Sequence, residues 1–375
     1  MRSESVVAIL FLWVASSHCA AQTAQEKGHV TMRLEILGAS DNKEQVLVPG
    51  EPMEARVTVS LSKDDNRNRR LRLYVGSLAV EVDRLPKRMT VRSEEGKETT
   101  EIEYTFPLFF APELLAEKGK VAYLFSRPGK HWVWVEDAET KALSAKASVL
   151  VRDLQPDEQA AFDSYAQLVE VPALLCGQSR AATTRQMDTF LQKHSASPYG
   201  PIVLLAKTLN ERETIRKRPI GSKADVLARD REVAKLADAF HTVVESTSNA
   251  FIRQRALFNL ALAKASGGEF ESACGTLKEL LLAFPAGAVY NDGAGLLKEL
   301  EDHRGEWQKR REELEVAPAA KPAPRTETRP EAEGQLPKQL SNVSPELPEL
   351  CSGVRLGTRP RKIASRICDT KGCSR

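Results

Sequence analysis

The chain has 375 residues, of which 42% are hydrophobic and 28% are charged. These proportions exclude a protein that is disordered throughout, and the length predicts two or three domains of ordinary size. The formal net charge is +3, but the segment from Cys351 to Arg375 alone holds seven basic side chains and one acidic side chain. The basic character therefore belongs to this tail, and the body of the protein is close to neutral.

Residues 1–21 have the three parts of a secretory signal peptide. A short start with one Arg leads into the apolar run Val6–Val14, and small residues follow up to Ala20–Ala21. This run is far shorter than the roughly 20 residues that span a bilayer, so we predict cleavage after Ala21 and a secreted or periplasmic protein. A lipid anchor at Cys19 is the alternative, but His18 stands where that processing needs Gly, Ala or Ser.

Residues 28–152 are predicted to be a β-domain because apolar and polar side chains alternate along several runs. The clearest runs cover 30–36, 54–61, 101–106 and 145–151, and turn-forming residues such as Pro49-Gly50 and Asp64–Asn68 separate them. Alternation places one face of each strand in a core. Seven or eight strands at this spacing favour an antiparallel β-sandwich.

Residues 154–315 are predicted to be helical, because the apolar period changes from two to three and four at Leu154. Pro156 suits the first turn of a helix, where its missing N–H is not needed. We expect six or seven helices that form an α-hairpin array. The breaks are expected near Gly177, Ser195–Pro198, Pro219–Gly221, Ser246–Ser248, Gly267-Gly268 and Pro285–Gly287.

Two resemblances follow from these segments. Leu257, Leu260, Ala261, Lys264, Ala273, Leu277 and Pro285 stand at the spacing of a tetratricopeptide repeat, without its Trp, Gly and Tyr. The pair of helices thus resembles a tetratricopeptide-like repeat, which implies a groove that holds a peptide or a partner protein. Val46–Leu61 and Phe125–Asp137 resemble the immunoglobulin-like sandwiches of exported bacterial proteins, although the Cys…Trp…Cys core is absent.

After residue 315 the chain is rich in proline, and we predict a disordered linker over 316–350 and a basic, cysteine-containing tail over 351–375. The candidate polyanion-binding residues of the tail are Arg355, Arg359, Arg361, Lys362 and Arg366. Their partner would be an anionic envelope polymer, and a solvated end without function is the alternative. The tail has no aromatic side chains to stack on bases, so we expect no specific nucleic-acid partner.

Five cysteines remain after signal cleavage. An odd number leaves at least one thiol free or paired with another chain. Cys368 and Cys373 are a candidate disulfide, because export makes oxidation chemically plausible, and free thiols are the alternative. Cys176 and Cys274 lie on predicted helices, either as small buried side chains or as a bridge.

Trp132 and Trp134 are predicted to lie on the same face of one strand, two residues apart. Such a pair most often packs in a sandwich core or against another domain. A site that stacks on a sugar ring or grips a peptide is the alternative, so both residues are candidate partner-binding residues.

No phosphate loop, dinucleotide fingerprint, zinc-binding HExxH or GxSxG elbow occurs in the sequence. Asp64–Asn68 lacks the Gly and the bidentate Glu that a calcium loop needs at its sixth and twelfth positions, so we predict a polar turn. We therefore expect no cofactor, no metal and no enzymatic activity. The predicted function is binding of a protein or peptide partner in the helical groove. The alternative is an envelope-associated hydrolase or its accessory subunit, with a site at the sandwich–helix junction.

Overall fold

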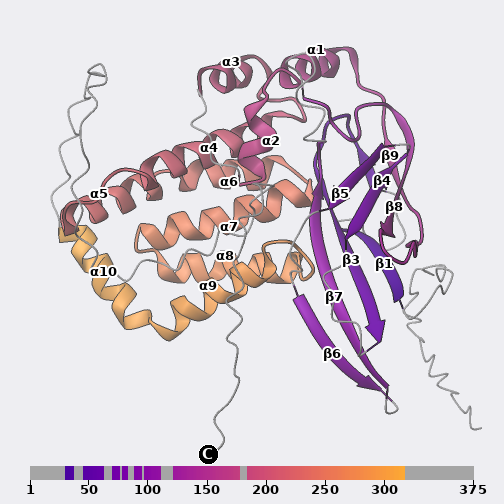
Figure 1. The fold of residues 1–375 in the computed structure, drawn as a ribbon. Helices are drawn as coiled ribbons and strands as arrows, with labels where there is room; N and C mark the ends of the chain where they lie inside the picture. Colours follow the sequence, from indigo (N-terminus) through magenta and orange to yellow (C-terminus); the bar gives the residue numbers. More distant parts are fainter. Residues whose placement is uncertain are drawn as a thin grey trace, which may run out of the picture.

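The structure is a computed structural model that describes residues 30–37, 45–62, 70–76, 78–82, 88–94, 97–110, 121–177 and 184–316. The predicted signal peptide, the Asp64–Asn68 turn, the proline-rich linker after Val316 and the basic tail lie outside these residues. The described residues form an N-terminal region of two β-sheets, followed by a helical region beside it (Figure 1). This order agrees with the sequence prediction.

Nine strands lie within the described residues. They are β1 (Val30–Leu37), β2 (Gln45–Leu47), β3 (Met53–Ser62), β4 (Leu71–Val75), β5 (Leu78–Val82), β6 (Arg88–Glu94), β7 (Lys97–Leu108), β8 (Gly129–Asp137) and β9 (Ala147–Val151). One sheet has the order β1-β3-β7-β6, and the other has the order β2-β9-β8-β4-β5.

The alternating side chains of these strands produce one shared core. In the first sheet, Val57 of β3 pairs with Leu34 of β1 and with Tyr104 of β7, and its side chain is fully buried. In the second sheet, Val133 and Val135 of β8 are also fully buried, and they belong to the same apolar cluster. The hydrophobic effect across this cluster holds the two sheets together.

The expectation of a purely antiparallel arrangement was wrong at one edge. β2 pairs with β9 in parallel, with Val46 opposite Leu150. The alternation of side chains fixes which face of a strand is buried, but it carries no information on strand direction. Because β2 and β9 are separated by about a hundred residues of chain, no short hairpin forces them to be antiparallel.

Ten helices follow within the described residues. They are α1 (Pro156–Tyr165), α2 (Glu170–Leu175), α3 (Thr184–His194), α4 (Gly200–Arg216), α5 (Lys223–Ala234), α6 (Ala237–Ser246), α7 (Ala250–Ser266), α8 (Phe270–Ala283), α9 (Tyr290–Asp302) and α10 (Arg304–Val316). Pro156 begins α1, as predicted.

The helix count exceeds the predicted six or seven because three short breaks lack Gly and Pro. All six predicted breaks fall between helices of the structure. The additional breaks lie at Ala166–Val169, Lys235–Leu236 and His303, where single turns interrupt otherwise helical chain. Without a residue that disfavours helix, sequence periodicity runs across such breaks.

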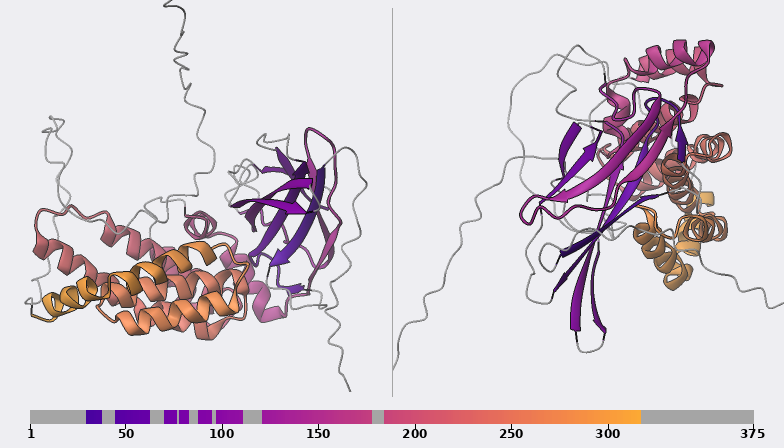
Figure 2. Two further views of the ribbon diagram at one scale, coloured as in Figure 1. Left: turned by 90° about the horizontal axis from the view of Figure 1, so that it is seen from below. Right: turned by 90° about the vertical axis from the view of Figure 1, so that its right-hand side faces the viewer.

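Consecutive helices pack side by side from α6 to α9, and α4 lies against α6 on the other side (Figures 1 and 2). A second apolar cluster lies beneath α7, α8, α9 and α10, with Leu257, Leu277 and Trp307 among its members. This arrangement exposes a surface across α6, α7 and α8.

The β-region and the helical region share a third apolar cluster. It joins Val48, Phe109 and Tyr123 of the β-region to Tyr165 and Tyr199 of the helical region. The three tyrosine rings stack in a row, with centroids 5.1 Å and 4.7 Å apart. The two regions are therefore packed against each other through a common core.

The turn between β2 and β3 enters this aromatic row. The Tyr199 hydroxyl donates a hydrogen bond of 2.8 Å to the carbonyl of Pro49, and Tyr165 donates a longer one to the carbonyl of Gly50. Gly50 has a positive φ of 77°, and a Cβ there would lie 2.9 Å from Phe162. Only glycine accommodates both this backbone conformation and the close approach of the rings.

Candidate binding groove

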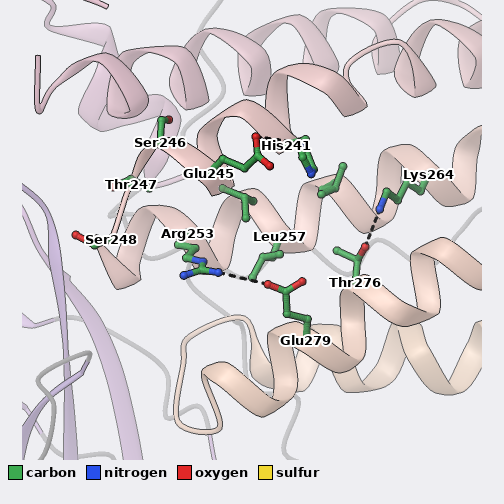
Figure 3. A pocket seen from close by; sticks show the side chains of 12 residues that line it. His241, Glu245, Ser246, Thr247, Ser248, Arg253, Leu257, Lys264, Thr276 and Glu279 are labelled. Carbon is green, nitrogen blue, oxygen red and sulfur yellow. Dashed lines mark hydrogen bonds and ion pairs between the residues drawn. The ribbon is translucent and has the colours of Figure 1, made fainter. Parts of the chain in front are cut away.

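A groove crosses the helical region between α6, α7 and α8, and we call it the α7 groove. Its volume is about 550 Å³. Figure 3 shows its side chains, which converge from three helices and from the connection before α7. The residues that line it are His241, Val244, Glu245, Ser246, Thr247, Ser248, Arg253, Leu257, Leu260, Lys264, Thr276 and Glu279.

One stripe of α7 supplies the base of the groove. Arg253, Leu257, Leu260 and Lys264 follow one another at intervals of four, three and four residues, which places them on one side of a helix. Leu257 and Leu260 are almost fully buried. The groove thus has an apolar floor with a cationic side chain at each end.

The charged side chains of the groove are paired across helices. Arg253 of α7 faces Glu279 of α8 at 3.4 Å, and the Lys264 ammonium donates to the Thr276 hydroxyl at 3.0 Å (Figure 3). On the opposite wall, His241 Nδ1 lies 3.5 Å from a carboxylate oxygen of Glu245, one turn along α6. The Arg253–Glu279 and His241–Glu245 pairs are exposed and exchange readily with water or with a ligand, because each contributes little free energy.

Small residues hold α7 and α8 close together. Ala261 and Ala273 are fully buried, and their small side chains allow a close approach of these helices. Gly268, in the turn between them, has φ of 82°, and a Cβ there would lie 2.9 Å from the side chain of Arg311. The tight turn and the small contact residues fix the width of the α7 groove.

The N-terminus of α7 is anchored to the β-region by Asn249. Its side-chain oxygen accepts a hydrogen bond from the Ile252 N–H and caps the helix, while its amide nitrogen donates to Glu51 at 2.7 Å and to the Pro52 carbonyl at 2.9 Å. Glu51 also accepts from the Val48 N–H. One side chain therefore sets both the start of α7 and its position on the β-region.

Burial raises the pKa of Glu51 above its ordinary value of 4.5. The hydrogen bonds from Val48 and Asn249 and the positive charge of Arg152 oppose this shift without cancelling it. Glu54, three residues further on, is 1% exposed and receives hydrogen bonds from Gln254 and from the Ala288 N–H. Both carboxylates at the junction are thus engaged by neighbouring donors.

The tryptophans do not lie in the sandwich core, which was one of the two packing environments expected for them. Both lie on the outer face of the five-stranded sheet, and Trp132 is 45% exposed. The alternation of β8 explains this placement, because Val133 and Val135 occupy the buried face and leave the opposite face to the two indoles.

Some of the remaining predicted site residues lie on helices, and the others lie outside the described residues. Cys176 is buried, Cys274 is partly exposed, and no disulfide joins the two. Burial is the main cause of a raised pKa of Cys274. Cys368 and Cys373 lie outside the described residues. So do the candidate polyanion-binding residues Arg355, Arg359, Arg361, Lys362 and Arg366.

Sequence reasoning identified Lys264, Leu257 and Leu260 through the repeat pattern, but it missed the rest of the α7 groove. His241 and Glu245, an i, i+4 pair on α6, carried a weak signal of a shared helix face. Arg253 and Glu279 carried none, because they lie 26 residues apart on different helices.

No protein-family model matches this chain, and no curated protein is significantly similar to it. Within the described ranges, no three His, Cys, Asp or Glu side chains are grouped as metal ligands. None of the helices described here has the length and apolar character that crossing a bilayer requires.

Proposed function

We propose that this protein is an exported, non-enzymatic binding or scaffold protein that holds a segment of a protein or peptide partner in the α7 groove. In this proposal the two sheets are an immunoglobulin-like β-sandwich, and the helices are tetratricopeptide-like hairpins. The observation that carries the proposal is the α7 groove itself, which has a volume of about 550 Å³ and an apolar floor between polar walls.

The size and chemistry of the groove suit a peptide. Its volume lies within the roughly 300–1,000 Å³ of ordinary ligand sites. An apolar side chain of the partner would contact Val244, which is partly exposed, above the buried side chains of Leu257 and Leu260. Its polar neighbours would exchange with the pairs at Arg253 and Lys264. Because the Arg253–Glu279 pair is exposed, breaking it for a partner costs little.

The attachment of α7 to the β-region supports a scaffold role. Asn249 and Glu54 connect the two regions by hydrogen bonds, and the tyrosine row fills the space behind them. A groove whose walls are held in place loses less conformational freedom on binding. The β-region would then present the groove in a fixed orientation.

The alternative, a hydrolase or accessory subunit with a site at the junction, has less support. Of the carboxylates there, Glu54 is buried and Glu51 is partly buried, and they receive hydrogen bonds from Val48, Asn249 and Gln254. A catalytic acid or base must reach a proton of the substrate, and these groups are turned toward the protein.

A random-peptide library bound to the immobilised mature chain tests the proposal. We expect enrichment of peptides that lose binding to Lys264→Glu and keep binding to Lys298→Glu, a matched reversal at an exposed position of α9 outside the groove. Recovered peptides that bind both variants equally, or a library that yields no binder, would contradict the proposal.

A further inference from the structure

The outer face of the five-stranded sheet carries aromatic and cationic side chains at neighbouring positions. In the right-hand view of Figure 2, β8 and β9 lie toward the viewer and the helices lie behind them. The register places Tyr74 of β4 opposite Trp134 of β8, and Ser148 of β9 opposite Trp132. The face formed by these strands is called the indole face below.

Trp134 is enclosed by its neighbours on the indole face. The Tyr74 ring stacks parallel to it, with the centroids 5.1 Å apart and an angle of 1° between the planes. The Lys146 ammonium lies 4.9 Å from the ring centroid of Trp134. These contacts hold the Trp134 ring in place and cover it.

Trp132 is less covered: the Lys130 ammonium lies over its ring, 5.1 Å from the centroid. Its neighbours across the strands are Ser148 and Gly76, and the Gly76 N–H donates a hydrogen bond to the Trp132 carbonyl. A Cβ added at Gly76 would meet no atom within 4 Å, so the space on that side is open. Two small neighbours leave the indole 45% exposed, although side chains of this size are usually covered in a folded protein.

The indole face is also positively charged. Lys130, whose ammonium lies 5.1 Å from the Trp132 ring centroid, and Lys146 are both exposed. Glu136 is the acidic side chain of β8 on this side. It is held by the Tyr74 hydroxyl and the Lys141 ammonium, which lowers its pKa. Two exposed ammonium groups, those of Lys130 and Lys146, thus lie over the two indole rings of this face.

We propose that the indole face binds an acidic polysaccharide that contains uronic acid residues. The C–H face of one sugar ring would stack on Trp132, and its carboxylate would meet the ammonium groups of Lys130 and Lys146. Single-stranded nucleic acid fits less well, because it needs successive rings for stacking and Trp134 is already covered by Tyr74 and Lys146. This site lies on the sheet and is independent of the α7 groove.

Titration of the full mature chain with an oligogalacturonate, with a neutral cello-oligosaccharide as comparison, tests the proposal. Trp132→Ala should weaken uronate binding about tenfold, the loss expected for a stacked ring. Trp132→Tyr should retain most of the affinity. The double variant Lys130→Gln/Lys146→Gln should lose the preference for the uronate over the neutral sugar, while Lys298→Gln should not.

Every variant keeps the basic tail, so a difference between variants reports on the indole face alone. Because Trp132 is half exposed, Trp132→Ala should keep its thermal midpoint, and circular dichroism checks this. Uronate affinity unchanged in Trp132→Ala, equal affinity for the neutral sugar, or no uronate binding would overturn the proposal. So would tighter, Trp132-dependent binding of an oligothymidylate.

Discussion

Gln254 Nε2 donates a hydrogen bond of 2.5 Å to Glu54 Oε2, although the two residues are 200 positions apart. Arg255 lies 2.8 Å from the other oxygen of the same carboxylate, and the Ala288 N–H donates to Oε2 at 3.2 Å. A single buried side chain of β3 thus connects the β-region to α7 and to the connection between α8 and α9.

Replacement of Glu54 by Ala should destabilise the protein by about 3–5 kcal/mol, because it leaves the side chains of Arg255 and Gln254 without their buried partner. The free energy of unfolding in urea measures this. Glu271→Ala, which removes an ion pair with Arg304 at an exposed position, should cost less than about 1 kcal/mol. Equal losses in the two variants would contradict the role assigned to Glu54.

Substitutions at Gly50 and Gly76 distinguish the stability cost of backbone strain from that of steric conflict. Both have positive φ, but a Cβ at Gly50 would lie 2.9 Å from Phe162, whereas a Cβ at Gly76 would meet nothing within 4 Å. Gly76→Ala should lower the unfolding free energy by about 1–2 kcal/mol through strain alone. Gly50→Ala should lose at least about 1 kcal/mol more because the aromatic row must move. Thermal unfolding of the two variants measures these losses. Equal losses of unfolding free energy would refute the steric contribution.

The order of sheets and helices was predictable because it depends on local periodicity. Alternation at Val30, Met32 and Leu34 indicated a strand, and spacing at Phe162 and Tyr165 indicated a helix. The parallel edge of β2 was not predictable, since strand direction depends on contacts made about a hundred residues later. Local sequence patterns determine which segments form strands or helices. Contacts between segments far apart in the sequence determine how the strands pair.

The candidate site was predictable only where it coincided with the repeat pattern. Leu257, Leu260 and Lys264 stood out by their spacing on one helix. Glu279 became part of the groove only through the packing of α8 on α7. Trp132 was expected to pack in a core or against another domain, because large aromatic side chains are usually buried, but the valines of β8 already occupy the core face.

The pH dependence of stability should differ in sign between Glu51 and Glu158. Burial raises the pKa of Glu51 above 4.5, so its contribution to stability is present below pH 4.5 and is lost as the pH rises through its folded pKa. The hydrogen bond from Arg152 lowers the pKa of Glu158, so its contribution is present above pH 4.5 and is lost as the pH falls.

Urea unfolding of the wild type, Glu51→Gln and Glu158→Gln from acidic to neutral pH checks these signs. The stability of the wild type minus that of Glu51→Gln should decrease as the pH rises. The corresponding difference for Glu158→Gln should increase. A difference for Glu51→Gln that grew with pH would show that the hydrogen bonds from Val48 and Asn249 outweigh the effect of burial.

Substitutions at Ala273 and Ala283 test how closely α7 and α8 pack, because both residues lie on α8 and they differ in burial. Ala273 is fully buried, and Ala283 is exposed. Ala273→Leu adds three carbon atoms to a filled contact and should destabilise the protein by about 1–3 kcal/mol, while Ala283→Leu should change stability by less than about 0.5 kcal/mol. Because Thr276 and Glu279 of the α7 groove lie on the same helix, Ala273→Leu should also weaken binding of groove-specific peptides. A stable Ala273→Leu variant with unchanged peptide affinity would show that the helices are not held at the separation described above.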